Sequence, residues 1–463
     1  MRCAGASGDL RRIPERSPSV TVTPVPRPER CLAVAILIVA LAPSAPVEAQ
    51  SLDGPASAEV LGLGEVLELA RRHNPQLRAL RAAAEAATYR ELEASTLPDP
   101  TFQIGVMNFG LPDFNTDMPM SMAPSVQLMQ LVPFPGKLGL RGEIADFRGQ
   151  MASATAEEAW WEVRGAASAL FYDLYALDRR IEVMRETLSL LQDFQQVAKA
   201  MYSAGSGRQA DVLRADVEVA RLDGDIRQMA AMRAGKASRL NAVVDRPAAT
   251  DVPSPALGAL PTRLPDPTVL EAWARENRPV LVRARLGIEQ AQSRSELADK
   301  QIWPDFTIGL SYGQRDRGSG AERMASAMLG FNLPIHAGRR QYVMRDEAAA
   351  MRRLAHAELQ GREADVNASI GVLLAELGRA RSLTELYRDE VIPTARVTVE
   401  SAFSSYRVGG VDFMTLVDAQ MTVNRYQGDL YALLGDYGRA IAALESTVGR
   451  ILPRTGPVLR EER

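Results

Sequence analysis

The sequence predicts a mainly α-helical protein with a small antiparallel β part, arranged as a tandem repeat. Three observations lead to this fold class. Residues 70–106 align with residues 274–310 without a gap, with proline, leucine and glycine at matching positions. Each repeat contains one very long helical pattern. Each also contains two short runs in which apolar and polar residues alternate, as expected of strands with one apolar face.

Composition narrows the class of protein. The 463-residue chain has a formal net charge of −3, whereas a nucleic-acid-binding protein would need a strong basic excess. Aromatic residues are few and alanine is abundant, which favours long, closely packed helices over a compact globular core. We therefore expect no nucleic-acid partner.

Residues 1–49 are predicted to be a secretory signal peptide. The apolar run at 31–42 follows several arginines and precedes a V-E-A motif that ends at Ala49, a pattern that fits signal-peptidase cleavage. Both cysteines, Cys3 and Cys31, fall within this segment, so the exported chain is expected to lack disulfides and thiol chemistry. No later apolar run reaches about 18 residues, so no transmembrane helix is predicted.

The first repeat, residues 50–245, reads helix, strand, strand, long helix, tip, helix. At 1.5 Å per residue its long helix spans roughly 100 Å, and its two shorter helices together match that length. We therefore expect the shorter helices to stack end to end beside the long one. The elements are predicted at 64–95, 101–110, 125–132, 138–202 and 208–244.

The second repeat, residues 268–450, has the same order of elements. Pro393 lies inside its long helical pattern and should kink it. Six prolines in residues 246–267 predict an extended linker between the repeats, and residues 451–463 are predicted to be a disordered tail. The elements are predicted at 268–300, 306–312, 326–333, 339–405 and 411–449.

The four alternating runs have the length of transmembrane strands, with one apolar face and one polar or small face. In the second repeat, for example, Phe306 and Ile308 alternate with Thr307 and Gly309. The alternative is a small soluble sheet packed on helices. Four strands cannot close a barrel within one chain, but three chains would supply twelve.

The chain reverses direction at two similar stretches, residues 202–215 and 406–419, which we call the first and second tips. Each begins with a tyrosine and has a glycine three residues later. Glycine after a helical run supplies the left-handed cap that ends a helix. Apolar residues beside both tips recur at steps of three and four, which predicts antiparallel coiled coils. The helix lengths place both tips at the same end of the repeats.

These features together resemble the TolC family of outer-membrane efflux channels, over roughly residues 60–450. The resemblance rests on the tandem repeat, on the Pro-Phe-Pro-Gly-Lys segment from Pro133 to Lys137, and on the two tips. It implies a homotrimer whose four transmembrane β-strands per chain close a 12-stranded β-barrel in outer-membrane lipid. A tandem-repeat α-barrel of long coiled-coil helices would continue it through the periplasm. The implied partners are a periplasmic adaptor (membrane fusion) protein and a proton-driven inner-membrane pump.

The resemblance also assigns roles at the tips. Asp211 and Asp418 match acidic residues of the family's gate, which implies a role in gating or inter-helix links for Asp211 and a lumen-facing acidic ring, one residue per chain, for Asp418. Thr415 replaces the aspartate that often accompanies Asp418, and Val411 replaces a latch arginine, a role open to Arg407 or Arg208. Tip links and adaptor contacts are implied for Tyr202, Gly205, Tyr406, Arg407, Gly409 and Gly410.

A plainer interpretation stays open for each of these residues. Asp211 is also a helix N-terminal carboxylate of the kind that the helix dipole favours. Asp418 is also compatible with a solvated outer face, and the glycines are turn residues first.

Methionines are concentrated in and beside the first inter-strand loop. Thioether sulfur suits Cu(I) or Ag(I), and the Met-Pro-Met-Ser-Met segment resembles the heavy-metal branch of the family. The candidates are Met118, Met120 and Met122, and the alternative is a flexible loop without ligands. Heavy-metal cations are therefore the expected cargo, with drugs or secreted proteins as the alternatives.

An enzyme is not expected, and no cofactor is predicted. His73, His336 and His356 have no metal-ligand spacing. Residues 205–210 fit the dinucleotide pattern G-x-G-x-x-A but follow a helix rather than a strand. The remaining alternative is a soluble periplasmic coiled-coil scaffold or the adaptor itself, although an adaptor would carry one hairpin rather than two.

Overall fold

The computed structural model describes residues 60–108, 111–112, 121–261, 263–316, 320–453 and 458–459. These residues belong to one compact unit, and the predicted signal peptide lies outside them. None of the described helices is long and apolar enough to cross a membrane. The first repeat contains α1 (Leu63–His73), α2 (Pro75–Ser95), β1 (Thr101–Met107), β2 (Met122–Val132), α3 (Lys137–Ser203) and α4 (Gln209–Val243).

The second repeat follows the same order. A two-residue strand, β3 (Leu260–Pro261), precedes it, and β6 (Val458–Leu459) follows it. Its elements are α5 (Pro267–Asn277), α6 (Pro279–Lys300), β4 (Phe306–Asp316), β5 (Ala321–Phe331), the 3₁₀ turn η1 (Ala337–Arg339), α7 (Gln341–Leu386), the π turn η2 (Tyr387–Val391), α8 (Ile392–Arg407) and α9 (Phe413–Val448).

Two predicted helices, 64–95 and 268–300, are each broken in two. The breaks fall at Asn74 and Arg278, each of which precedes a proline and has an extended ψ of 121° or 117°. The proline ring disfavours helical geometry in the preceding residue but suits the first turn of a new helix. The side chain of Asn74 also caps α2 by accepting a hydrogen bond from the backbone N–H of Leu77 at 3.1 Å.

The long helices match the sequence expectation. α3 runs for 67 residues without a break. In the second repeat the π turn η2 separates α7 from α8 immediately before Pro393, which confirms a local irregularity there.

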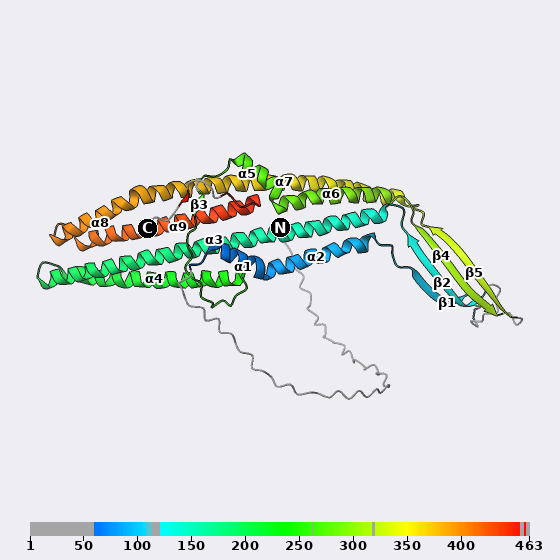
Figure 1. Ribbon diagram of the computed structural model, residues 1–463, viewed down its shortest axis with the longest axis horizontal. Coiled ribbons are helices and arrows are strands. Elements are labelled where there is room, and N and C mark those ends of the chain that lie inside the picture. Colours follow the sequence, from blue (N-terminus) through cyan, green and yellow to red (C-terminus); the bar gives the residue numbers. More distant parts are fainter. Residues whose placement is uncertain are drawn as a thin grey trace, which may run out of the picture. The chain divides into compact units, whose positions relative to one another are not determined.

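The shorter helices stack end to end along the long ones, as predicted. α2 and α4 both pack on α3, and the break before α2 meets the end of α4, where Asn74 Nδ2 donates to the carbonyl oxygen of Val243 at 2.9 Å. α6 and α9 lie between α3 and the α7–α8 pair. Figure 1 shows both tips at one end of these helices and the four long strands at the other.

The largest core cluster lies in the middle of the helices and joins the two repeats. Phe171 and Tyr175 of α3 and Tyr437 of α9 are almost fully buried in it. Beside them, the guanidinium of Arg164 pairs with the carboxylate of Glu445 at 2.5 Å, with both side chains under 10% exposed. Glu445 also accepts the backbone N–H of Leu452.

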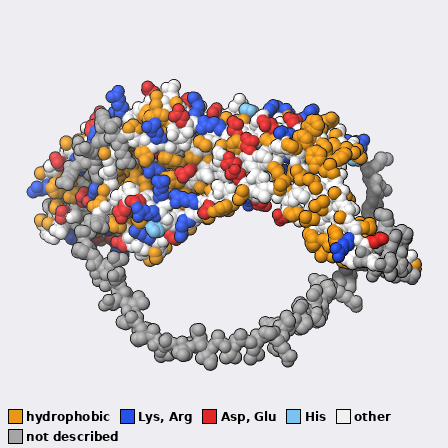
Figure 2. Space-filling model, turned by 45° about the vertical axis from the view of Figure 1, so that its right-hand side comes forward, with side chains coloured by type: hydrophobic (Ala, Val, Ile, Leu, Met, Phe, Trp, Pro, Cys, Tyr) orange, Lys and Arg blue, Asp and Glu red, His pale blue; other side chains and the backbone are white. Residues whose placement is uncertain are grey.

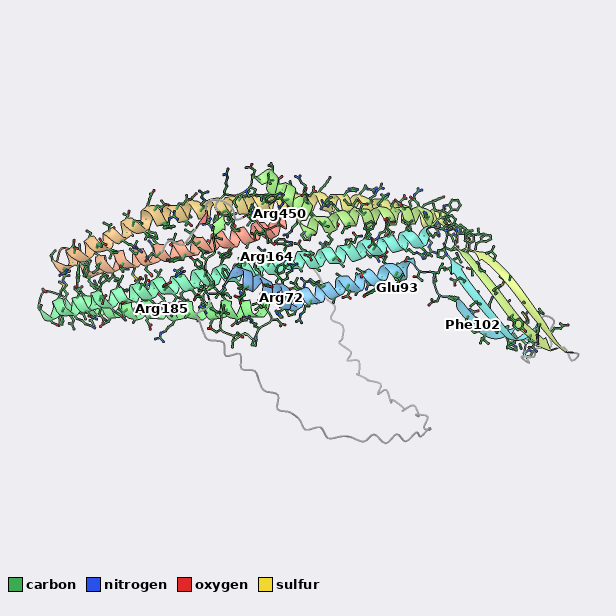
Figure 3. The ribbon with its side chains drawn as sticks, in the orientation of Figure 1. Arg72, Glu93, Phe102, Arg164, Arg185 and Arg450 are labelled. Carbon is green, nitrogen blue, oxygen red and sulfur yellow. The ribbon has the colours of Figure 1, made fainter. Side chains whose placement is uncertain are left out.

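The four long strands form one antiparallel sheet in the order β1-β2-β4-β5, so the central pairing, β2 with β4, joins the repeats. One face carries apolar residues in register across the strands, and many of them are exposed. Phe102, labelled on β1 in Figure 3, is one of them. Figure 2 shows hydrophobic side chains gathered over the strands and the adjoining helix ends. The other members include Ile104, Leu128, Leu310, Tyr312, Leu329 and Phe331.

The interior junction between sheet and helices is an ion pair with a ring stack. Lys137 Nζ lies 2.8 Å from Asp305 Oδ1 and donates to the carbonyl oxygen of Trp303 at 2.7 Å. The Lys137 side chain is 2% exposed. The rings of Phe134 and Trp303 stack with centroids 5.3 Å apart. One repeat supplies Phe134 and Lys137, and the other supplies Trp303 and Asp305.

The segment predicted to be an extended linker packs against the core, and part of the segment predicted to be a disordered tail pairs with it. Val252 and Leu260 of the linker are buried, and the hydroxyl of Tyr437 donates to the carbonyl oxygen of Pro261 at 2.6 Å. Val458–Leu459 of the tail pairs with Leu260–Pro261. The linker packs because it covers apolar side chains of the central core that would otherwise face water.

The substitution Arg164→Met tests the buried pair. It leaves the Glu445 carboxylate buried without its cation, so we expect unfolding stability to fall by about 3 kcal/mol. Arg185→Met is the matched control, because Arg185 is an exposed residue of the same helix (Figure 3), and it should cost less than about 0.5 kcal/mol. Thermal unfolding followed by circular dichroism measures both, and equal melting temperatures would contradict the expectation.

Candidate functional site: the two hairpin tips

Both tips reverse the chain by the same hydrogen-bonded turn. Gly205 and Gly409 each adopt a φ of +73°, a left-handed conformation that glycine accepts at little cost. The backbone N–H of Gly207 donates to the carbonyl oxygen of Met201 at 2.9 Å, and Gly410 donates to that of Ser405 at 2.8 Å. These are Schellman-type closures. The predicted reason for glycine is therefore confirmed at both tips.

The first tip also needs a glycine two residues after Gly205, at Gly207. A Cβ atom at Gly207 would lie 2.8 Å from the backbone nitrogen of Tyr202, closer than packing allows. At the second tip, Gly410 approaches the Ser405 carbonyl, where a Cβ would lie at 3.3 Å. Any side chain at Gly207 would thus push the first tip open.

The helix that leaves the second tip has a side-chain cap, and the helix that leaves the first has none. Asp412 accepts hydrogen bonds from the backbone N–H of Thr415 at 2.9 Å and from its hydroxyl at 2.6 Å. Arg208 occupies the same place at the first tip without a side-chain cap. The second tip is therefore fixed more firmly at its helix start.

A second apolar cluster joins the two hairpins near their tips. The rings of Phe194 and Phe403 stack at 5.4 Å, and Tyr406 meets Phe413 edge to face at 5.6 Å. Leu222 of α4 is buried in the same cluster. The coiled-coil positions predicted from sequence thus pack within one hairpin and also between hairpins.

Charges on the two tips are complementary. Hydrogen bonds from the side chain and backbone of Thr415 lower the pKa of the Asp412 carboxyl, and the positive charges of Arg214 and Arg208 on the first tip lower it further. Burial raises the pKa of the Tyr406 hydroxyl, and the negative charge of Asp211 raises it further. The hydroxyl of Tyr406 is buried and has no hydrogen-bond partner among the described residues. Asp211 and Tyr406, which were assigned separately from sequence, therefore interact electrostatically across the two tips.

Asp418 does not take part in this contact. It lies on α9 with an exposed side chain, on the same helix face as exposed Thr415 and half-buried Thr422, whose hydroxyl donates to the Asp418 carbonyl oxygen. The structure therefore separates the two predicted acidic residues: the charge of Asp211 acts on Tyr406 of the second tip, whereas Asp418 is exposed to solvent.

The remaining predicted tip residues are accessible. The side chain of Tyr202 is 48% exposed. Arg407 is exposed and lies over the Phe403 ring at 6.0 Å. Val408, which follows it, is 82% exposed, an unusual degree for a large apolar residue in a turn.

A shallow apolar groove, which sequence analysis missed, lies between α4 and α9 beside the tips. It has a volume of about 440 Å³ and is lined by Leu213, Arg214, Val217, Glu218 and Met414. Leu213 and Val217 lie one helical turn apart and are both more than half exposed. Leu213 and Val217 do not belong to the heptad positions that form the hairpin seam. Apolar residues outside the seam were visible in the sequence and could have indicated this groove.

The predicted methionine site is only partly described. Met118 and Met120 lie outside the described residues, whereas Met122 lies in β2 and is 8% exposed. Within the described part of the chain, no cluster of three or more His, Cys, Asp or Glu side chains is placed to hold a metal ion.

The fold is that of bacterial outer-membrane channels. The chain matches the crystal structure of the outer membrane protein VceC from Vibrio cholerae with a TM-score of 0.71 and 16% identity, covering 84% of this chain and 96% of that one. It matches a membrane protein from Pseudomonas aeruginosa with a TM-score of 0.72 and 18% identity, covering 84% and 93%.

The sequence comparisons point to the same class of protein. Residues 272–450 match the family model described as outer membrane efflux protein, so the chain carries a domain of that family. The cobalt-zinc-cadmium resistance protein CzcC of Cupriavidus metallidurans is 21% identical over 392 residues, which cover 84% of this chain and 90% of the relative. The resemblance read from the repeats and tips is confirmed, in agreement with the predicted outer-membrane location.

The substitution Asp412→Ala tests the cap. Loss of an N-cap costs about 1 kcal/mol, so the amide of Thr415 should exchange with solvent roughly five-fold faster. Asp418→Ala, an exposed carboxylate further along the same helix, is the control and should leave that amide unchanged. Hydrogen exchange read by mass spectrometry of tip peptides measures both. Unchanged exchange in Asp412→Ala would show that the cap does not hold the tip.

Proposed function

We propose that the chain is the outer-membrane channel of a tripartite efflux system, a passive conduit from the periplasm to the exterior. The observation that carries this proposal is the position of its two ends. Continuous helices connect a sheet with one exposed apolar face to a pair of tips with exposed apolar and charged residues. One end suits lipid, and the other suits a protein partner.

The sheet favours a closed trimer. β1 and β5 are its two edges, and each has unpaired backbone groups along one side. Such edges are stable in lipid only when they are paired. Pairing of β5 in one copy with β1 in the next closes a ring, and three copies supply twelve strands.

The tips serve as the gate. The apolar cluster with the Phe194–Phe403 stack joins the two hairpins of one chain, and opposite charges on the tips, Asp412 against Arg208 and Arg214, favour the closed arrangement. Opening separates these groups and exposes the buried hydroxyl of Tyr406. No bond is made or broken in the cargo, so the conduit needs no catalytic residue, and the energy comes from an inner-membrane pump.

A periplasmic adaptor docks at the tips. The groove of Leu213, Val217 and Met414, together with the exposed Val408 and Tyr202, provides apolar surface at this end. Small apolar grooves with a charged rim suit helical partners. The turn glycines have no side chains, so they leave these apolar residues uncovered.

The cargo class follows from the relative. CzcC is a cobalt-zinc-cadmium resistance protein, so we propose heavy-metal cations as cargo. A strain that lacks the gene should lose tolerance to cadmium, zinc, copper or silver by several-fold in minimal inhibitory concentration, while its tolerance to dyes and antibiotics stays unchanged. Complementation with the intact gene is the control, and unchanged metal tolerance would contradict the cargo.

Membrane fractionation tests the conduit itself. The chain should sediment with the outer membrane and run as an oligomer that dissociates on heating. A monomer in the periplasmic fraction would support the scaffold alternative instead.

The substitution Asp418→Asn tests the proposed acidic ring. If three Asp418 side chains face the lumen, their removal reduces the local cation concentration, because like charges in a narrow ring attract counter-cations. We expect the cation-to-anion permeability ratio in single-channel recordings to fall by about two-fold or more. Asp429→Asn, further from the tip on the same helix, is the control. Equal selectivity in all three proteins would place Asp418 outside the lumen.

A further inference from the structure

We infer that paired methionines on the polar face of the sheet form stepping sites for a soft monovalent cation such as Cu(I) or Ag(I). This inference names a cargo class for the proposed conduit and rests on that function. Four residues carry it: Met122 and Met129 of β2, and Met324 and Met328 of β5. Only Met122 was a candidate from sequence.

The strand register places Met129, Met324 and Met328 in two rows, and the approach of the Met122 side chain to Gly313 adds Met122 to the row of Met324. Met129, Gly309 and Met328 are register partners across β2, β4 and β5, and Gly313 lies between Met324 and the β2 segment that carries Met122. In each row a glycine of β4 separates methionines from the two flanking strands. The rows lie four residues apart along β4, roughly 13 Å.

The methionine side chains lean over the glycines. A point placed as a Cβ on Gly309 would have Met328 Cε at 3.4 Å and Met129 Cγ at 3.6 Å. The same point on Gly313 would lie 2.5 Å from Met122 Sδ. The missing side chain of Gly309 therefore leaves space that Met129 of β2 and Met328 of β5 enter from both sides, and the missing side chain of Gly313 leaves space for Met122.

A β-bulge brings Met122 to this face. The register between β1 and β2 shifts between Gly105 and Met107, next to the Met122 end of β2. Simple alternation from Ser125 would place Met122 on the apolar face. The shift re-aims it onto Gly313, a common role of bulges beside functional sites.

The residues around the methionines favour weak, reversible binding of a soft ion over tight binding. The row between the two glycines is polar and uncharged, with Gln103, Gln127, Ser311 and Ser326 in register. Thioethers prefer Cu(I) and Ag(I) over Zn²⁺ or Co²⁺, which favour nitrogen and oxygen. Two neutral ligands per site hold an ion weakly, and several weak sites in sequence allow it to leave. Met328 is 46% exposed, so the row of Met129, Gly309 and Met328 is open to solvent.

Silver binding to the purified full chain in detergent tests the inference. Silver nitrate is titrated in chloride-free buffer by calorimetry into the wild type, into Met129→Leu/Met328→Leu, and into Met232→Leu/Met351→Leu. The last pair is the matched control, because both of its methionines are about half exposed on helices. We expect the strand variant to weaken silver binding at least ten-fold and the control to leave it unchanged. Equal affinity in all three proteins would overturn the inference.

Peroxide footprinting locates the site independently. Silver should slow the oxidation of Met129, Met324 and Met328, read by peptide mass spectrometry, by at least three-fold. It should leave Met232 and Met351 unaffected. Protection of Met118 and Met120 alone would assign silver to the loop and overturn the inference. Neither measurement depends on transport. If the wild-type chain binds no silver at these methionines but still confers metal tolerance in cells, the methionine site is rejected and the conduit function is not.

Discussion

The buried pair of Lys137 and Asp305 fixes the relation between sheet and helices. Lys137 begins α3 immediately after the turn that ends β2, and Asp305 immediately precedes β4. Burying an unpaired ammonium costs several kcal/mol, so the two repeats are stable only when they meet in this register. The β2–β4 pairing and the α3–α6 packing start from the same point, and the position of the distant tips follows from it through rigid helices.

Much of the fold could be predicted from the sequence because helices and strands follow local, periodic patterns of apolar residues. The bounds of α3 were predicted within one residue, since nothing in that stretch breaks a helix. The breaks at Asn74 and Arg278 were missed because proline also suits a helix start, so the periodic pattern continues on both sides. Strand β4 was predicted too short because Gln314, Arg315 and Asp316 end the alternation before they end the pairing.

At the candidate site, too, the features set by local sequence were predicted, and the interactions between distant residues were not. The glycines of both tips were predicted because a left-handed turn requires them at fixed places. The electrostatic interactions of Asp211 with Tyr406 and of Asp412 with Arg214 were not predicted, since they join residues that are distant in sequence. The position of Met122 was hidden by a bulge, which shifts the alternation that assigns a strand residue to a face, and the pairing of Met129 with Met328 depends on the order of the strands, which joins residues distant in sequence.

The π turn at Tyr387–Val391 makes the two hairpins mechanically unequal. α3 reaches the first tip as one unbroken helix, whereas the path to the second tip passes through a wider turn next to Pro393, which lacks a backbone donor. A torque applied at both tips bends the softer arm first. In the proposed trimer, straight first hairpins and more flexible second hairpins would alternate, and we expect the second hairpins to move more than the first ones.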